Sequence, residues 1–331
     1  MKLLNFGSLN TRGIKTVEHN DGSRSLFLSN ILSDIRKNNI DVIGIQESHL
    51  GEHEYKQNEK DYVCFFVNDE NNAHHGAGII IRSIYNPTFR RISPRVCTAS
   101  FSIDNKLYLF VSGYAPHETR ANKNVDERID FYNDLQKALK LKTANTITVI
   151  ALDANAKTSY NPELHPHVLG RFTKGNYTNK NGQHIIHFAA QNDLFLTNTK
   201  FQHKQSQRST WTAPFRVFRT KNGEIRKNPV RNQIDYILID KKYLQFVTDA
   251  RSYNNKNTQT DHNLVVMNMK IEFSKLNKPN KSPTPRINEE NFKKPELAEK
   301  YKEEIIKRQN SAERKVCTDN NEKWTRLQRS W

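Results

Sequence analysis

Short apolar runs rich in β-branched and aromatic residues recur along the chain up to residue 273, and they constrain its fold more than any other feature. Each run has the length of a strand and is too short to span a bilayer. The runs that we predict to be strands cover residues 3–6, 42–45, 77–81, 107–111, 147–152, 234–239 and 264–273. A chain with this many strands needs at least one large sheet, and it needs other elements to cover that sheet.

Amphipathic segments lie between some of these runs. Apolar residues at helical spacing predict one helix at Leu28, Ile31, Leu32 and Ile35, and a second at Phe131, Leu135, Ala138 and Leu139. A third helix is predicted at 183–192. Successive strands between 77 and 111 have no helix between them, so the pattern favours an α/β fold with mixed sheets over a purely parallel one.

The composition changes after residue 273. Residues 274–285 are rich in Pro, Lys, Ser and Asn, which is typical of an extended linker. Residues 295–309 are charged and compatible with a helix, but no further apolar core follows. We therefore expect one domain at 1–273 and a basic linker with a charged helical tail at 274–331.

The chain of 331 residues is strongly basic, with a formal charge of +17 from 52 Lys and Arg against 35 Asp and Glu. The tail from residue 274 holds 15 basic and nine acidic residues, so most of the excess belongs to the predicted domain. This charge favours an anionic partner, of which nucleic acid is the first hypothesis, although a basic protein without a polyanion stays open. The sequence does not indicate an oligomeric state.

Three cysteines, Cys64, Cys97 and Cys317, form no CxxC or Cys/His cluster. We therefore expect no disulfide framework, no structural zinc and a reducing compartment, nuclear or cytoplasmic. The first apolar run breaks at Asn5, which is not typical of a signal peptide, and we expect no membrane segment.

Acidic and amide residues gather where the apolar runs begin or end. Glu47 follows one run, Asp153 and Asn155 end another, Asp235 opens a third, and Asp261 with His262 precedes the last. By strand alternation, Asn155 is expected on the same face as Asp153. Each residue alone has an ordinary structural explanation as a turn or strand-end residue. Together they offer carboxylates for a hard cation, a histidine with a carboxylate partner and amides for phosphate oxygens, which indicates phosphoryl hydrolysis.

The motifs around these residues resemble the endonuclease/exonuclease/phosphatase family, which includes exonuclease III and the apurinic endonucleases. They are SLNTRG at 8–13, QES at 46–48, GYAP at 113–116, LDAN at 152–155, TW at 210–211, QIDY at 233–236 and TDH at 260–262. Within the family, the chain looks most like the endonuclease of RTE-type non-LTR retrotransposons. The motifs for that likeness are VLGR at 168–171, NG at 181–182, FAA at 188–190, LTNTKFQHK at 196–204 and STWTAP at 209–214.

The resemblance implies a four-layered α/β sandwich, in which two packed mixed sheets are flanked by helices. It also implies a divalent cation, Mg2+ with Mn2+ as a substitute. The residues that match the family's metal site are Glu47, Asp261 and Asn10, and those that match its catalytic positions are Asp153, Asn155, His262, Asp235 and Tyr114. In these roles Asp153 would orient or activate water, Asn10 and Asn155 would hold the nucleophile and phosphate, and Asp235 would fix the tautomer of His262. The sequence does not decide which residue is the general base.

DNA is the partner that the resemblance and the charge imply. The expected nucleic-acid contacts are Arg12, Arg171, Lys200, His203, Lys204 and Trp211, with further basic sets at 90–91 and 216–227. For Trp211, the sequence favours a wall of the core or site over a platform that stacks on a base. Histidines 165, 167, 184 and 187 show no HExxH spacing, so we expect no zinc role for them.

One departure from the family bears on the substrate. Apurinic endonucleases have a tryptophan three residues before the Asp of the Asp-Tyr motif, where this chain has Asn232. A nicking DNA endonuclease of the retrotransposon type therefore fits better than an abasic-site enzyme. Two alternatives stay open: a phosphatase of the same fold acting on an inositol phosphate, lipid or nucleotide, and an inactive DNA-binding remnant.

Overall fold

The computed structural model describes residues 3–270, except for 15, 19–23, 51–52, 70–71, 73–74, 119–124, 164–166, 214–215, 220–224, 229 and 255–259, together with residues 299, 302 and 303. The chain divides into two units, Met1–Glu272 and Phe273–Trp331. The linker, most of the helix expected at 295–309, and Cys317 lie outside the described residues.

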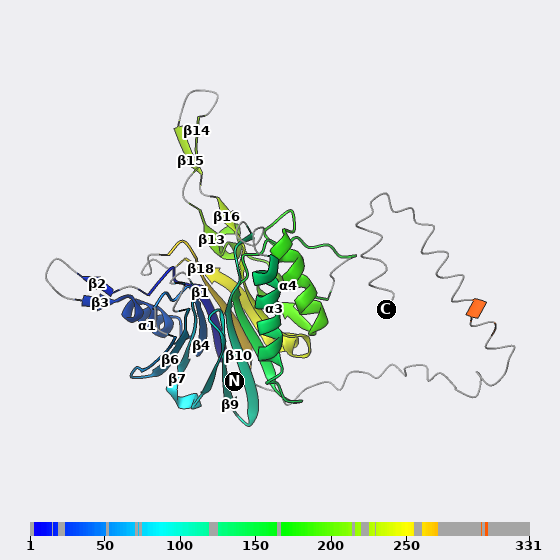
Figure 1. Cartoon of the computed structure of the whole chain (residues 1–331). Helices are drawn as coiled ribbons and strands as arrows, with labels where there is room; N and C mark the ends of the chain where they lie inside the picture. Colours follow the sequence, from blue (N-terminus) through cyan, green and yellow to red (C-terminus); the bar gives the residue numbers. More distant parts are fainter. Residues whose placement is uncertain are drawn as a thin grey trace. The chain divides into compact units, whose positions relative to one another are not determined.

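Two mixed sheets form the centre of the first unit (Figure 1). The seven-stranded sheet has the order β18 (Val247–Tyr253), β19 (Leu264–Lys270), β1 (Leu3–Asn10), β4 (Val42–Gln46), β7 (Ala77–Arg82), β6 (Tyr62–Val67) and β5 (Glu54–Asn58). In this sheet β1 runs parallel to β4 and antiparallel to β19.

The six-stranded sheet has the order β12 (Leu194–Leu196), β17 (Asp235–Asp240), β11 (Ile147–Asp153), β10 (Lys106–Tyr114), β9 (Val96–Ile103) and β8 (Thr88–Ser93). Here β10 runs parallel to β11, while β17 and β9 are antiparallel to their neighbours. Both sheets are mixed, as the succession of strands without intervening helices predicts.

Helices cover the outer faces of the two sheets. The helix α1 (Phe27–Lys37) packs with Leu9, Ile43 and other residues of the seven-stranded sheet. The helices α3 (Val125–Leu139) and α4 (Lys180–Gln191) pack on the six-stranded sheet. The expected four-layered sandwich is therefore confirmed. None of the described helices has both the length and the apolar character needed to cross a membrane.

Smaller elements surround this frame. A two-stranded ribbon of β13 (Trp211–Thr212) and β16 (Arg231–Asn232) leads into the hairpin of β14 (Arg216–Arg219) and β15 (Ile225–Asn228), which projects from the sandwich in Figure 1. The remaining short elements are β2 (Thr16–Glu18), β3 (Arg24–Leu26), the helix α5 (Gln205–Arg208) and 3-10 turns at Ser83–Tyr85, Thr197–Thr199 and Lys241–Phe246.

The inner faces of the sheets pack through aromatic residues in one region and very small residues in another. Phe6 of β1 stacks on Phe110 of β10, with ring centroids 6.1 Å apart. Gly44 of β4 faces Ala151 and Ser112, so closely that a Cβ at Gly44 would lie 2.7 Å from the Ala151 Cβ. The two sheets therefore approach each other closely near the ends of β4 and β11, because Gly44 has no side chain to keep the opposite strand away.

This close approach predicts a specific cost for a methyl group. We expect Gly44→Ala to lower the free energy of unfolding by about 1–3 kcal/mol, because the added Cβ overpacks a rigid interface. Urea unfolding of the purified protein measures the change. The double variant Gly44→Ala, Ala151→Gly should recover part of the loss, and equal stability of Gly44→Ala and the original chain would contradict the described approach of the sheets.

Candidate active site

The ends of five strands meet at one edge of the sandwich and bring polar residues together. Asn10 ends β1 and Glu47 follows β4, both from the seven-stranded sheet. Tyr114 and Asp153 end β10 and β11 of the other sheet, and Asp153 lies opposite Asp235, the first residue of β17. The two sheets thus contribute to one cleft, as expected from where the apolar runs stop.

Asn10 links the carboxylates of the two sheets. Its amide Nδ2 donates to Glu47 Oε1 and to Asp153 Oδ2, each at 2.7 Å. Its oxygen accepts the backbone N–H of Arg12 at 2.9 Å, which fixes the orientation of the amide. In this arrangement Asn10 presents hydrogens, rather than its oxygen, to the carboxylates.

Glu47 is held in a backbone conformation that few side chains adopt. Its φ is +53°, and its N–H donates to the carbonyl of Gly76 at 3.0 Å. Burial alone would raise the pKa of its carboxyl, but hydrogen bonds from His49, Asn10 and Tyr114 lower that pKa to about 2. Glu47 is therefore an anion at any physiological pH.

Asp153 is 1% exposed and lies among other ionisable groups. Burial and the neighbouring charge of Asp235 raise its pKa, while His262 and Asn10 act in the opposite direction. The backbone N–H of Asn155 donates to its Oδ1 at 3.0 Å. A buried carboxyl whose pKa is raised in a cleft is suited to accept or donate a proton.

His262 and Asp235 form a buried pair. The imidazole Nδ1 lies 3.0 and 3.2 Å from the two oxygens of Asp235. Burial lowers the pKa of His262, but the charge and the hydrogen bond of Asp235 raise it to about 9. The histidine is thus an imidazolium at neutral pH, with Nδ1 bound to Asp235 and Nε2 left to face the cleft.

Asp261 closes another side of the cleft. Its Oδ2 accepts from the indole Nε1 of Trp211 at 2.9 Å and from Nη1 of Arg12 at 3.2 Å. Its Oδ1 is buried, lies 3.9 Å from His262 Nε2 and has no hydrogen-bond partner among the described residues. A buried carboxylate oxygen in this state is suited to a cation, because a desolvated charge needs a ligand.

Asn155 departs from its expected placement. The strand β11 ends at Asp153, and Asn155 has a φ of +47°, so it does not continue the strand face. Its Nδ2 donates to the carbonyl of Ala115 at 2.8 Å. Asn155 still reaches the cleft, where it lines a cavity with His262, but it does so through a turn of the backbone.

This cavity has a volume of about 460 Å³ and adjoins the His262 side chain. Trp211, Ala213, Val230, Asn232 and Ile234 form a largely apolar wall, and His117, Glu118 and Lys157 line the rest. Trp211 therefore belongs to the wall of the site, where its N–H also holds Asp261. Asn232 stands in this wall at the position where the apurinic endonucleases have a tryptophan.

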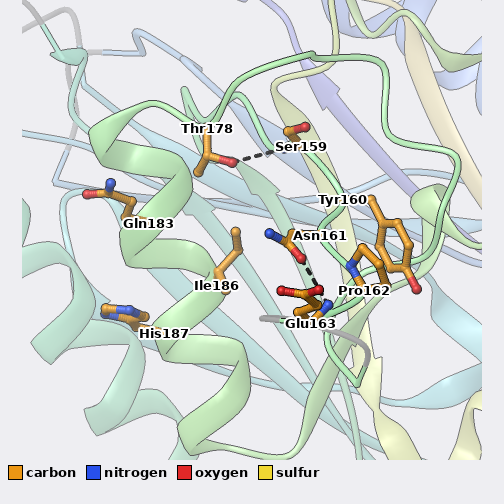
Figure 2. Close-up of a pocket in the computed structure, with 9 residues that line it drawn as sticks. All are labelled: Ser159, Tyr160, Asn161, Pro162, Glu163, Thr178, Gln183, Ile186 and His187. Atoms are coloured by element: carbon orange, nitrogen blue, oxygen red, sulfur yellow. Dashed lines mark hydrogen bonds between the residues drawn. The ribbon is translucent and has the colours of Figure 1, made fainter. Parts of the chain in front are cut away.

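A second hollow of about 610 Å³ lies along α4, as Figure 2 shows. It is lined by Ser159, Tyr160, Asn161, Pro162, Glu163, Thr178, Gln183, Ile186 and His187. Among the described residues that line it, Glu163 is the only acidic one. It offers no paired carboxylates, so we place the chemistry at the strand ends.

One group of residues at the strand ends has the spacing of metal ligands among the described residues. Asp153, Asp235 and His262 present ligand atoms within 4.8 Å of one another. However, both oxygens of Asp235 already face His262 Nδ1, so this trio is better described as a His–Asp pair beside a carboxylate. Glu47 and the unpartnered oxygen of Asp261 are the stronger candidates for a hard cation.

Not every expected DNA contact reaches the cleft. Lys200 Nζ donates to the carbonyl of Leu244, and His203 Nε2 lies 2.7 Å from Asp249 of β18. Both side chains are thus bound to parts of the sandwich that lie away from the cleft. Arg171 and Lys204 are exposed on loops, and Arg12 stands at the rim on Asp261.

The structure also adds residues that the sequence analysis missed. His49 Nε2 lies 3.5 Å from Glu47 Oε2, and a histidine two positions after a strand-end glutamate is a signal that a search could use. The Arg95 guanidinium lies 5.2 Å above the Tyr114 ring, and its Nη2 contacts His75 Nε2 at 2.6 Å. No sequence signal joins Arg95 to His75, because Arg95 lies in the turn between β8 and β9 and His75 lies in the loop before β7.

Strand-end carboxylates beside a His–Asp pair, on two packed mixed sheets, define a class of phosphoester hydrolases. A family model described as Endonuclease/Exonuclease/phosphatase family matches residues 7–262. The chain therefore belongs to this family of nucleases and phosphatases, and the family expected from the motifs is confirmed.

Individual relatives are distant. "Craniofacial development protein 2" of Bos taurus is 25% identical over 256 residues, which are 73% of this chain and 38% of that protein. The chain thus spans well under half the length of this relative.

Solved structures share the fold. The endonuclease domain of TRAS1, a telomere-specific non-LTR retrotransposon, matches with a TM-score of 0.52 at 10% identity, over 81% of this chain and 99% of that one. The AP endonuclease LMAP from Leishmania major matches with a TM-score of 0.54 at 12% identity, over 81% of this chain and 88% of that one. TDP2 of D. rerio, complexed with a single-strand DNA product, matches with a TM-score of 0.52 at 13% identity, over 82% of this chain and 100% of that one.

The geometry of the His–Asp pair predicts how His262 titrates in the metal-free protein. We expect its pKa to be about 9, so that the ring is protonated below this pH and becomes neutral above it. In Asp235→Asn, burial remains but the charge partner is lost, so the pKa should fall by roughly two units. Histidine NMR signals followed against pH measure both values, and an unchanged pKa in the variant would contradict the pairing.

Proposed function

We propose that the chain is a metal-dependent DNA endonuclease that nicks phosphodiester bonds. The observation that carries this proposal is the buried His262–Asp235 pair, which faces a cleft shared with the carboxylates of Glu47, Asp153 and Asp261. Such a cleft combines a positive group for a phosphate with carboxylates for a cation and for a proton. The family comprises hydrolases of phosphoester bonds, which agrees with this chemistry.

We assign the cation to Glu47 and Asp261. Both offer carboxylate oxygens, the ligands that Mg2+ and Mn2+ prefer, and the buried Oδ1 of Asp261 accepts no hydrogen bond from the described residues. A bound cation would supply Lewis-acid stabilisation of the negative charge that develops on the phosphate. Asn10 orients the Glu47 carboxylate, because its Nδ2 donates a hydrogen bond to Glu47 Oε1.

The chain's own residues supply the remaining steps. Asp153 accepts the proton of the attacking water, since its pKa is raised and Asn10 and the Asn155 backbone fix its direction. His262 donates a hydrogen bond from Nε2 to the phosphate, and Asp235 keeps its ring charged. Tyr114 steadies the Glu47 carboxylate with its hydroxyl.

DNA fits the site better than a small phosphate ester does. The cavity beside His262 has a wall of apolar side chains suited to a sugar or base, and Lys157 lies on its rim. The basic excess of the first 273 residues favours a polyanion. With Asn232 in place of an aromatic residue, the wall lacks the surface for a dedicated abasic pocket, which favours nicking without abasic specificity.

A plasmid assay tests the proposal. We expect purified protein to nick supercoiled plasmid with Mg2+ and to stop in EDTA. Glu47→Gln should lower the rate by about 1,000-fold, because several kcal/mol of charge stabilisation are lost. Glu163→Gln, an exposed residue of the other hollow, is the matched control and should retain full activity.

The alternatives give different outcomes in the same experiment. Release of phosphate from an inositol phosphate without nicking would identify a phosphatase, and DNA binding without either activity would identify an inactive remnant. We also propose that residues 1–273 suffice for catalysis. A chain ending at residue 273 should then nick DNA with weaker affinity, and complete loss of cleavage would place the boundary elsewhere.

The His–Asp pair predicts a second kinetic result. Asp235→Asn and His262→Ala should each lower the nicking rate by on the order of 100-fold, and the double variant should lose little more than either alone, because the two residues act as one unit. His203 and Asp249 form another His–Asp contact away from the cleft, so Asp249→Asn with His203→Ala is the control and should keep the rate. If the rate losses of Asp235→Asn and His262→Ala instead multiply in the double variant, the two residues do not act as one unit.

A further inference from the structure

Three cationic side chains from separate segments come together beside the ribbon of β13 and β16. Lys174 lies on the loop before α4, Arg208 ends α5, and Arg231 opens β16. The backbone N–H of Lys174 donates to Gln233 Oε1 at 3.1 Å, and Arg208 Nη1 donates to the carbonyl of Thr173 at 3.4 Å. These bonds join α5 to the loop that holds Thr173 and Lys174, and they join this loop to Gln233, which lies between β16 and β17. We name Lys174, Arg208 and Arg231 the ribbon patch.

The ribbon patch and the catalytic cavity lie on opposite faces of the ribbon. Val230 and Asn232 line the cavity. Side chains alternate along a strand, so within β16 Arg231 projects to the face opposite Asn232. Gln233 follows directly after the strand. The contact between Lys174 and Gln233 agrees with this, so only the thickness of the ribbon separates the patch from the cavity.

The three cations have no acidic counterpart in the part of the chain that the structure describes. Lys174 Nζ donates to the neutral Gln205 Oε1 at 3.2 Å, and none of the three forms an ion pair with a described carboxylate. Burial, followed by the charges of Arg208 and Arg231, lowers the pKa of Lys174. The Nε of Arg208 is buried without a hydrogen-bond partner. Like charges held together in this way destabilise the free protein, and an anion would relieve them.

We propose that the ribbon patch binds the backbone phosphates of duplex DNA that flanks the bond at the catalytic cleft. The inference rests on the proposed function, and it assigns a surface to the flanking DNA. A duplex presents one negative charge per about 1.7 Å of its axis, so a strand that places one nucleotide in the cavity carries further phosphates past the ribbon. Phosphate oxygens accept from lysine and arginine without reading sequence.

The choice of these residues differs from what the sequence suggests. Lys200 and His203 lie in a conspicuously basic motif, yet the structure binds them to Leu244 and Asp249. The ribbon patch comes from three segments that are dispersed along the chain. The basic surface beside the cleft is therefore created by folding.

Salt-dependent DNA binding tests the ribbon patch. Binding of a fluorescent duplex to the full chain is measured by anisotropy in EDTA, with KCl from about 50 to about 200 mM. We expect the variant Lys174→Gln, Arg208→Gln, Arg231→Gln to lower the slope of log affinity against log salt by about 2 to 3, since each phosphate contact contributes about 0.9. The charge-preserving variant Lys174→Arg, Arg208→Lys, Arg231→Lys should keep the slope.

A matched control removes three charges elsewhere. Lys140, Lys241 and Lys242 are exposed at the opposite end of the six-stranded sheet, where β11 begins and β17 ends, and their glutamine variants should leave the slope within about 1 of the original. Thermal unfolding checks that each variant folds. If the triple patch variant does not fold, the exposed Arg231→Gln alone should lower the slope by about 0.9.

The outcomes separate this inference from the proposed function. If the original chain binds and nicks DNA but the patch variants match the control, the ribbon patch is wrong and the endonuclease stands. If the original chain neither binds nor nicks DNA, the proposed function and the patch both fall. A selective loss of slope in the patch variant, with nicking by the original chain, supports both.

Discussion

The amide of Asn10 joins the two sheets at the point where their charges are closest. Glu47 comes from one sheet and Asp153 from the other, and two facing carboxylates repel each other unless a donor lies between them. One amide nitrogen carries two hydrogens, and it bonds to each carboxylate at 2.7 Å. The cleft therefore depends on a neutral side chain, and an acidic residue at this position would add to the repulsion that Asn10 now relieves.

The rest of the cleft is held in conformations that a free chain would avoid. Arg12, Glu47, His49 and Asn155 all have positive φ, and they surround the same strand ends. Asp153, Asp235 and His262 are charged or chargeable groups with at most 6% exposure. Such arrangements destabilise a protein by themselves, so the packed sheets must fix the backbone beneath them. The small residues Gly44 and Ala151 matter for this reason, because they bring the strand ends to their short separation.

The inner strands were predictable because both of their faces are buried. β4, β7, β11 and β17 are nearly continuous apolar runs. β6 at Tyr62–Val67 carries the same signal but was not among the predicted strands. The polar edge strands β5 and β18 lack it, since one side of each has no neighbouring strand. At the site, strand-end residues were predictable by type. The turn at Asn155, the Arg95–His75 contact and the tethering of Lys200 were not, because each depends on which distant segments meet.

The ribbon beside the cleft is also bonded to the segment that carries Asp261 and His262. The backbone of Trp211 bridges to His262, the Thr212 N–H donates to the Asp261 carbonyl, and the hairpin of β14 and β15 extends from the same two strands. The position of the segment with Asp261 and His262, the proposed metal and phosphate contacts, therefore depends on its backbone bonds to the ribbon. A shift of the hairpin by one residue would invert the faces of the ribbon and move Asp261 and His262 with it. The length of the hairpin stem is therefore constrained by the positions of Asp261 and His262.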